Sequence, residues 1–391
     1  MSTLLRSSLL SHDRFARAAW SRVAEPGDAV AHRLIRAHGP VAALQMAACG
    51  AEPGVERFLP RLEVLDVERD LEIGAKYSAR VLCPGDPDWP SGLDDLAAPP
   101  YCLWARGPVD VALSCERSVA VVGARSATAY GQMVAAEISA GLSERRFTII
   151  SGAGFGIDAA AHRGALAAGA VTIAVLAGGV ERPYPSSHAA LIANIAEGGA
   201  VISEVAPGSA PTRTRFLARN RLIATMARGT VVVEAGLRSG SLNTARTAAE
   251  HGRLVAAVPG PVTSWTSAGC HEAIRCGLAQ LVTNAAEAAE LIGDYGTDLA
   301  PARRGPTLAG DDLDEHAARV LSALPLGRGV PVARLAVSSG LSIAEVESVL
   351  ARLDLRSLAE HRGQDWRKGP AVRKTWVQDS GGRACGGGDP R

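Results

Sequence analysis

The stretch Val119-Ala-Val-Val-Gly-Ala-Arg-Ser126 joins a short, wholly apolar run to a glycine and then to a polar loop. Similar short runs rich in β-branched residues recur up to residue 292, and alanine-rich segments of helical character separate them. Continuous apolar strands that alternate with helices are typical of an α/β fold in which helices cover both faces of a parallel sheet. We therefore predict seven strands, at residues 119–122, 148–150, 171–176, 200–203, 230–234, 254–258 and 281–283.

The sequence on either side of this α/β domain (118–293) has a different texture. Residues 12 to about 75 carry apolar side chains at spacings of three and four, which indicates helices. Near the other end, Ser342 followed by Glu345 matches a capping box at a helix start. These patterns predict five further segments: a helical N-terminal domain (1–80), a Pro/Gly-rich linker and lead-in segment (81–117), a second linker (294–312), a small winged-helix-like module (313–367) and a disordered tail (368–391).

Charge and cysteine content limit the class of protein. The 391 residues include 41 basic and 40 acidic residues, so a generally sticky polycation is excluded and any nucleic-acid site must be local. The seven cysteines are an odd number without a Cys-x-x-Cys pair, which favours reduced thiols in a cytoplasm. We expect a cytoplasmic protein without membrane attachment, since the sequence shows neither a secretory segment nor a membrane span.

Basic charge is concentrated between residues 213 and 228. This segment holds five arginines, and the sequence has no Asp or Glu between Glu204 and Glu234. Arginine binds phosphate in a bidentate manner, and the start of a helix adds backbone N–H donors. The segment therefore suits a polyanion, and the alternative is a solvated helix face.

The loops that follow the predicted strands meet at one edge of the sheet, where open α/β sheets bind ligands. One of them, Ser151-Gly-Ala-Gly-Phe-Gly-Ile-Asp158, has glycines that either form a phosphate-binding nest or allow close packing of strand and helix. The spacing differs from the dinucleotide fingerprint, so we expect no nucleotide cofactor. Arginines converge on this edge around Phe216, as single-stranded nucleic acid requires; they are Arg125, Arg182, Arg213, Arg215, Arg219, Arg221 and Arg238.

The same loops offer isolated candidates for catalysis. Neither a nucleophile with its base nor a metal-ligand spacing is evident, so we expect a binding protein with no catalytic residue and no metal. His162 fits a packing or hydrogen-bonding histidine, while Asp158 and Glu234 fit carboxylates that fix helix starts and loops.

Several segments, in order along the chain, resemble the DNA-processing protein A family (DprA, also called Smf). The resemblance is carried by 121–126, 130–131, 151–162, 184–185, 203–204, 216–224, 233–235, 239–242, 258–260 and 269–271. It implies an extended Rossmann-like domain that binds single-stranded DNA and has no settled enzymatic activity. It also implies that the protein protects incoming single-stranded DNA and loads the RecA recombinase during natural transformation, as a homodimer.

Carried over residue by residue, the resemblance implies phosphate contacts for Arg125 and Arg213 and a base contact for Phe216. The loop from Gly152 to Gly156 and the helix start Arg219-Asn220-Arg221 would complete the pocket. Together with the convergent loops, the expected DNA-binding set is Arg125, Gly152, Gly154, Gly156, Arg182, Arg213, Arg215, Phe216, Arg219, Asn220, Arg221, Arg238 and Ser239. One departure from the family is that no basic residue follows Tyr184-Pro185, which weakens the case that this loop contacts DNA.

Two alternatives come from other classes of protein. A nucleotide-binding Rossmann-like hydrolase would bind a nucleoside monophosphate at the 151–158 loop and use Glu234 in turnover. A transcriptional regulator would read duplex DNA with the helix at 342–353, but that helix carries Glu345 and Glu347 against a single Arg352, which is poor for contact with a phosphate backbone.

Overall fold

The computed structural model describes residues 12–50, 52–302 and 310–372, and the chain divides into two compact units, Met1–Pro301 and Ala302–Arg391. The first unit is built on a nine-stranded sheet in the order β1-β2-β6-β5-β4-β3-β7-β8-β9. All seven predicted strands are present, as β3 (Ser118–Val122), β4 (Thr148–Ser151), β5 (Thr172–Leu176), β6 (Ala200–Ser203), β7 (Gly229–Val232), β8 (Leu254–Ala257) and β9 (Gln280–Leu281). These seven pair in parallel, which confirms the predicted fold class.

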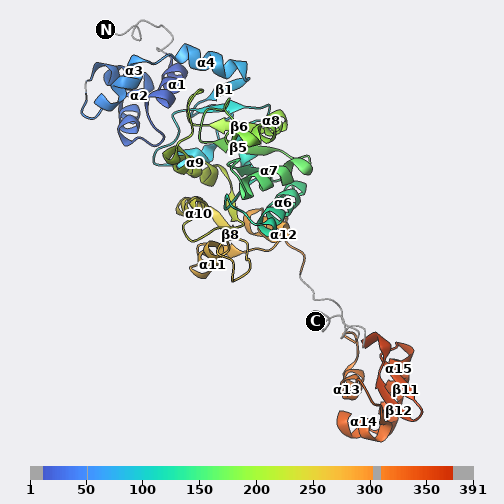
Figure 1. The fold of residues 1–391 in the computed structure, drawn as a ribbon. Helices are drawn as coiled ribbons and strands as arrows, with labels where there is room; N and C mark the ends of the chain where they lie inside the picture. Colours follow the sequence, from blue (N-terminus) through green and yellow to red (C-terminus); the bar gives the residue numbers. More distant parts are fainter. Residues whose placement is uncertain (1–11, 51, 303–309, 373–391) are drawn as a thin grey trace, which may run out of the picture. The chain divides into compact units, whose positions relative to one another are not determined.

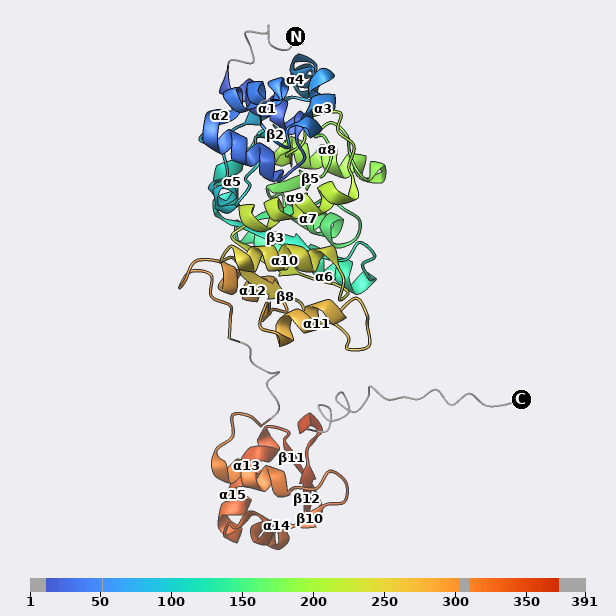
Figure 2. The same ribbon diagram turned by 90° about the vertical axis from the view of Figure 1, so that its left-hand side faces the viewer.

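Helices cover both faces of the sheet (Figures 1 and 2). The alternation of side chains along β3 shows why, because Val119 and Val121 join one buried cluster while Ala120 and Val122 join another. The first cluster includes residues of α6 (Ala129–Glu144), α7 (Ile157–Ala167) and α12 (Ala285–Ile292). The second includes residues of α9 (Arg213–Met226), α10 (Gly240–Glu250) and α11 (Ala268–Arg275). A further helix, α8 (Ala189–Gly198), packs beside α7 against β5 and β6.

The strand order changes direction at β3. From β3 the chain adds β4, β5 and β6 on one side, and then returns to add β7, β8 and β9 on the other side. The loops after β3 and β7 consequently leave the sheet in opposite directions and open a crevice at its carboxyl edge. This is the Rossmann-like arrangement, and it determines where a ligand site can form.

The N-terminal region is helical as predicted, with α1 (Asp13–Val23), α2 (Ala29–Cys49), η3 (Glu56–Phe58), α3 (Leu59–Glu63) and α4 (Val67–Lys76). It shares a buried cluster with the sheet, to which Trp20 and Phe58 contribute edge-to-face rings 5.5 Å apart. The Trp104 indole Nε1 donates to Ser21 Oγ at 3.1 Å and so ties β2 (Leu103–Arg106) to α1. The region therefore belongs to the same compact unit as the sheet.

The segment 81–117, which we expected to be a linker and lead-in, is folded into this unit. It contains the end of β1 (Ala79–Leu82), then η4 (Ser91–Asp95), β2 and α5 (Val111–Glu116), and β2 extends the sheet by pairing antiparallel with β6. Its prolines and glycines separate buried apolar side chains, among them Trp89 and Leu93. The segment has the amino-acid composition of turns, so the sequence did not indicate β2, which pairs with β1 and with the distant strand β6.

The second unit has the predicted three helices, α13 (Glu315–Ala323), α14 (Val332–Ser339) and α15 (Ile343–Leu355), with a small sheet ordered β10-β12-β11. Its strands are β10 (Val330–Pro331), β11 (Ala359–Arg362) and β12 (Asp365–Lys368), which fits a winged-helix-like module. The capping box at Ser342 and Glu345 is confirmed. The predicted second linker begins within the first unit, where Asp298 is buried and accepts a hydrogen bond from Arg117 at 2.7 Å. Residues 303–309 of this linker lie outside the described residues. Most of the predicted tail, 373–391, also lies outside them.

No helix in the described part of the chain combines the length and the apolar character needed to cross a membrane.

Candidate nucleic-acid interface

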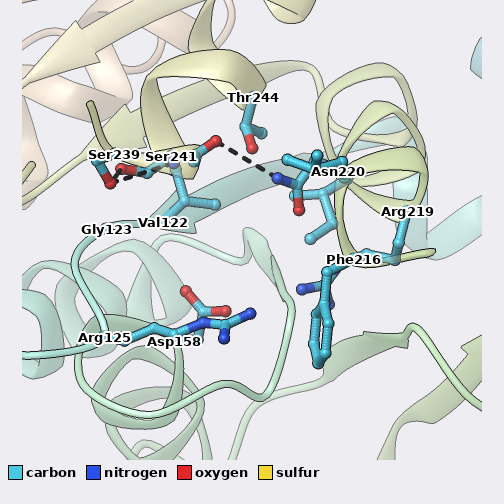
Figure 3. A pocket seen from close by; sticks show the side chains of 13 residues that line it. Val122, Gly123, Arg125, Asp158, Phe216, Arg219, Asn220, Ser239, Ser241 and Thr244 are labelled. Atoms are coloured by element: carbon cyan, nitrogen blue, oxygen red, sulfur yellow. Dashed lines mark hydrogen bonds between the residues drawn. The ribbon is translucent and has the colours of Figure 1, made fainter. Parts of the chain in front are cut away.

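A pocket of about 290 Å³ occupies the crevice where the strand order changes direction. The loops after β3 and β7 form two of its sides and α9 forms a third (Figure 3). Five of the residues expected to bind DNA line it, namely Arg125, Phe216, Arg219, Asn220 and Ser239. Gly152 does not line the pocket, but its carbonyl oxygen accepts a hydrogen bond from Arg219. The structure thus brings together residues that are up to 114 positions apart, since Arg125 and Ser239 line the same pocket.

An arginine and an aromatic ring face each other at the mouth of this pocket. The Arg125 guanidinium carbon lies 4.5 Å from the centre of the Phe216 ring, within the range of a cation–π contact. The Tyr184 ring lies 5.5 Å from the Phe216 ring and is 48% exposed. In the glycine loop after β4, Phe155 is 50% exposed and packs its ring 4.9 Å from that of His188. Aromatic surface therefore continues from the pocket along the ends of β4 and β5.

Four of the expected arginines are exposed and available to a ligand. Arg213 stands at the start of α9, where Thr212 caps the helix by accepting a hydrogen bond from the Arg215 backbone N–H at 3.2 Å. In the described part of the chain, no side chain forms a hydrogen bond or ion pair with the guanidinium groups of Arg125, Arg182, Arg213 or Arg238. Such unpaired cations beside a helix N-terminus favour an anionic ligand.

The other three expected arginines bind partners within the protein. Arg215 forms an ion pair with Glu25 of the N-terminal region, with nitrogen–oxygen distances of 2.9 Å, and Arg221 forms one with buried Glu204. Arg219 is buried and donates to the carbonyl oxygens of Gly152, at 2.9 Å, and Val175. Arg219 and Arg221 hold α9 against the sheet and Arg215 ties it to the N-terminal region. The sequence alone did not distinguish these three from the four exposed arginines.

Buried charges lie under the pocket. Burial lowers the pKa of the Arg219 guanidinium to about 10, and it raises the pKa of the Asp158 carboxyl, which also lines the pocket. The positive charges of Arg219 and Arg125 act against that rise in the pKa of Asp158. The Asp158 carboxylate accepts a hydrogen bond from the Gly154 N–H at 3.3 Å, so it fixes the glycine loop as we expected.

Close packing accounts for two of the three glycines in that loop. A Cβ atom on Gly152 would lie 2.2 Å from the Arg219 guanidinium, and one on Gly156 would lie 2.3 Å from the Ala124 carbonyl oxygen. Gly156 also has a φ of +73°, a conformation that favours glycine. The N–H of Gly154 is directed at Asp158. The contacts therefore support the packing interpretation of this loop.

The carboxylate of Glu234 and the imidazole of His162 form hydrogen bonds within the protein, as we expected. Glu234 is buried and accepts hydrogen bonds from Thr128 N at 2.9 Å, Thr128 Oγ1 at 2.7 Å and Thr266 Oγ1 at 3.1 Å. His162 is buried with its Nδ1 2.8 Å from Thr172 Oγ1, and burial lowers its pKa to about 3. Glu234 thus links the loop after β3 to the loop after β8.

Asn220 and Ser239 lie where α9 meets α10. The Asn220 amide donates to the Gly240 carbonyl at 3.4 Å, and Ser239 caps α10 by accepting from the Ser241 N–H at 3.3 Å. Sequence reasoning missed Leu217, Ser241 and Thr244, which line the same pocket. Their closeness in sequence to Phe216 and Ser239 could have indicated these residues, but their place in the pocket depends on the packing of α9 against α10.

Within residues 12–50, 52–302 and 310–372, no group of three or more His, Cys, Asp or Glu side chains is arranged to hold a metal ion.

Comparison with known proteins gives a consistent result. Residues 80–293 match a family model described as DNA recombination-mediator protein A. A DNA processing protein DprA of Mycobacterium tuberculosis is 46% identical over 366 residues, which cover 89% of this chain and 93% of that protein. Protein Smf of Escherichia coli is 38% identical over 259 residues, which cover 66% of this chain and 68% of that protein. Among solved structures, DNA processing protein A of Streptococcus pneumoniae matches with a TM-score of 0.62 and 30% identity, covering 73% of this chain and 99% of that chain.

Replacement of Gly152 by alanine tests the packing under the pocket. The added methyl group must displace the Arg219 guanidinium from the two carbonyl oxygens that it binds, so we expect Gly152→Ala to lower the free energy of unfolding by about 3 kcal/mol. Urea unfolding measures the loss. Gly154→Ala is the matched control, since its methyl group meets only the Asp158 carboxylate at 3.2 Å, and we expect a change of less than about 1 kcal/mol. Equal stability of the two variants would contradict this account.

Proposed function

This chain belongs to the DNA recombination-mediator protein A family, known by the names DprA and Smf, and from that premise we propose that it binds single-stranded DNA as a recombination mediator. It acts in the cytoplasm, protects incoming single-stranded DNA and loads the RecA recombinase during natural transformation. The observation that carries the DNA-binding proposal is the contact between Phe216 and Arg125, an arginine without an ion-pair partner among the described residues, at the mouth of the pocket.

This pair offers the two chemistries that a nucleic-acid strand presents. Exposed guanidinium groups bind phosphates, and an exposed aromatic ring stacks on the face of any base. In a duplex the bases stack on one another and their faces are hidden. Phe216, Tyr184 and Phe155 therefore favour a single strand over a duplex, while the arginines supply affinity that does not depend on sequence. The loop after β5 lacks a basic residue after Pro185, but its exposed Tyr184 ring could contact a base of the DNA strand.

The geometry disfavours the two alternatives. Glu234 is buried and already accepts three hydrogen bonds, so it is poorly placed to act on a nucleoside monophosphate as a hydrolase would require. In the second unit, Arg352 of α15 forms an ion pair with Asp314 at 2.7 Å, which removes the basic group that a duplex-reading helix would use. A role in protein contact suits that unit better.

A salt titration with fluorescent oligo(dT) tests the proposal. We expect the wild-type protein to prefer the single strand to a duplex of equal length. Arg125→Ala and Arg213→Ala each remove about one phosphate contact, so each should reduce the magnitude of the negative slope of log K against log salt by about 0.7. Phe216→Ala should weaken binding by about 1–3 kcal/mol, because it removes a stacking surface.

The matched control for these variants is Arg275→Ala. Arg275 is an exposed arginine in the last turn of α11 and is paired with Glu272 of the same helix, so its loss should leave both affinity and salt slope unchanged. Unchanged salt slopes in the Arg125 and Arg213 variants would refute the site. Equal affinity for duplex and single strand would refute the proposed function.

The description of the family as recombination mediators supports our proposal that the protein delivers DNA to RecA. We expect the wild-type protein to increase the initial rate at which RecA assembles on single-stranded DNA that is covered by a single-strand-binding protein. Arg125→Ala should lose this effect in proportion to its loss of DNA affinity, whereas Arg275→Ala should keep it. A wild-type protein that binds the strand tightly and slows RecA assembly would exclude the loading role.

We also propose that the protein is a homodimer, and the edge of the sheet at β9 supports this. β9 is the last strand in the sheet order, and exposed apolar side chains surround it, namely Leu281, Tyr295 and Leu299. They line a pocket of about 430 Å³. An open strand edge with apolar neighbours favours pairing with another chain.

Sedimentation equilibrium of the full chain tests the dimer. The wild type should sediment as a dimer, and Leu281→Glu should shift it to a monomer because the new charge lies at the strand edge. Val64→Glu is the control, since Val64 is also exposed but lies in the N-terminal helical region, and it should remain a dimer. A monomeric wild type at micromolar concentration would rule out the proposal.

A further inference from the structure

One tryptophan stands out by its exposure. Trp265, in the loop between β8 and α11, is 68% exposed, whereas Trp20, Trp89 and Trp104 are buried. Tryptophan is highly buried on average, so an indole left mostly in solvent is available to stack on a ligand. The function proposed above makes no use of this residue.

The position of Trp265 in the sheet places it along the edge that carries the pocket. In the strand order, β8 lies next to β7, and the loops after β5, β4, β3, β7 and β8 carry Tyr184, Phe155, Arg125, Arg238 and Trp265 in turn. Neighbouring strands lie about 4.8 Å apart, so the four steps from β5 to β8 span about 19 Å. That length accommodates several nucleotides of a strand.

One contact connects Trp265 to the loop that leads to the pocket. Its six-membered ring lies against the backbone of Gly236, where a Cβ atom would be only 3.2 Å from the ring. Two residues after Gly236 comes the exposed Arg238, and the next two residues, Ser239 and Gly240, line the pocket. The indole is therefore a direct continuation of the pocket wall formed by the loop after β7.

The loop that presents Trp265 is held in place by hydrogen bonds at both of its ends. The adjacent Thr266 is buried and donates to Glu234 at 3.1 Å, and Tyr130 donates to the Pro259 carbonyl at 2.7 Å. The same Glu234 carboxylate binds Thr128, three residues after Arg125. One carboxylate thus fixes both the loop that carries Arg125 and the loop that carries Trp265, which pre-organises the two for one ligand.

We propose that Trp265, together with Arg238, forms a second base-stacking subsite that extends the single-stranded DNA site from the Phe216 pocket to the end of β8. This inference rests on the proposed single-stranded DNA binding. The charge pattern supports a nucleic acid, because the sequence has no Asp or Glu between Glu234 and Glu250, nor between Glu250 and Glu272. Exposed Arg238, two residues after the Gly236 on which the indole packs, offers a phosphate contact, and the indole offers a stacking surface.

A length series of oligo(dT) tests the subsite in the full chain. A strand of about four nucleotides fills only the Phe216 pocket, so wild type and Trp265→Ala should bind it equally. A strand of about 16 nucleotides reaches the second subsite, and Trp265→Ala should bind it about tenfold more weakly than wild type, while Trp265→Phe keeps most of the affinity. The salt slope should stay unchanged in Trp265→Ala, because the indole contacts no phosphate. Indole fluorescence should be quenched by the long strand in wild type and less so in Trp265→Phe.

The outcomes separate the subsite from the proposed function. Leu113→Ala, at an exposed apolar residue of α5, is the matched control and should bind every length as wild type does. If Arg125→Ala weakens binding but Trp265→Ala leaves affinity unchanged at every length, the subsite is refuted and the proposed function stands. If Trp265→Ala changes only the effect on RecA assembly, Trp265 contacts a protein and the stacking role is refuted. If wild type fails to bind any strand, both proposals fall.

Discussion

The buried guanidinium of Arg219 is the constraint on which the site depends. It binds the carbonyl oxygens of Gly152, at the end of β4, and of Val175, in β5, and so pins α9 across the carboxyl ends of two strands. Phe216 lies three residues earlier, on the same face of the helix. Its ring is 5.8 Å from the Arg219 guanidinium carbon and 4.5 Å from that of Arg125. The buried Arg219 guanidinium therefore helps to fix the position of the Phe216 ring.

The N-terminal helices reinforce the same helix from the other side. Glu25 follows α1 and binds Arg215 near the start of α9, while Arg22 of α1 binds Asp70 and the Pro207 carbonyl in the segment that leads into α9. Burial raises the pKa of Asp70, and the contact with Arg22 acts against that rise. These contacts order the start of α9 in the absence of a ligand, so the candidate site is pre-organised. The helical region is thus part of the binding unit in physical terms.

Local sequence patterns predicted the strands, the helical regions and the glycine turns, because alternation, capping and turn chemistry act over a few residues. They also predicted that Arg125 and Phe216 belong to one edge, since the carboxyl ends of parallel strands meet there. They could not predict which arginines are buried. Arg219 finds its partner 67 residues away and Arg215 finds its partner 190 residues away, and such distances are decided by tertiary packing. For the same reason the strand β2 was hidden in a segment with the composition of a linker.

Carboxylates and arginines at this edge differ in how they are engaged within the protein. The carboxylates of Glu204 and Glu234 point inward, where hydroxyl and N–H groups or an arginine of the protein bind them, and Asp158, which lines the pocket, accepts from the Gly154 N–H. Guanidinium and aromatic groups point outward, toward a ligand. The carboxylates at this edge hold loops in place, and the groups that the edge exposes to solvent are guanidinium groups and flat apolar rings. These groups suit a nucleic-acid strand whose phosphates and base faces are both accessible.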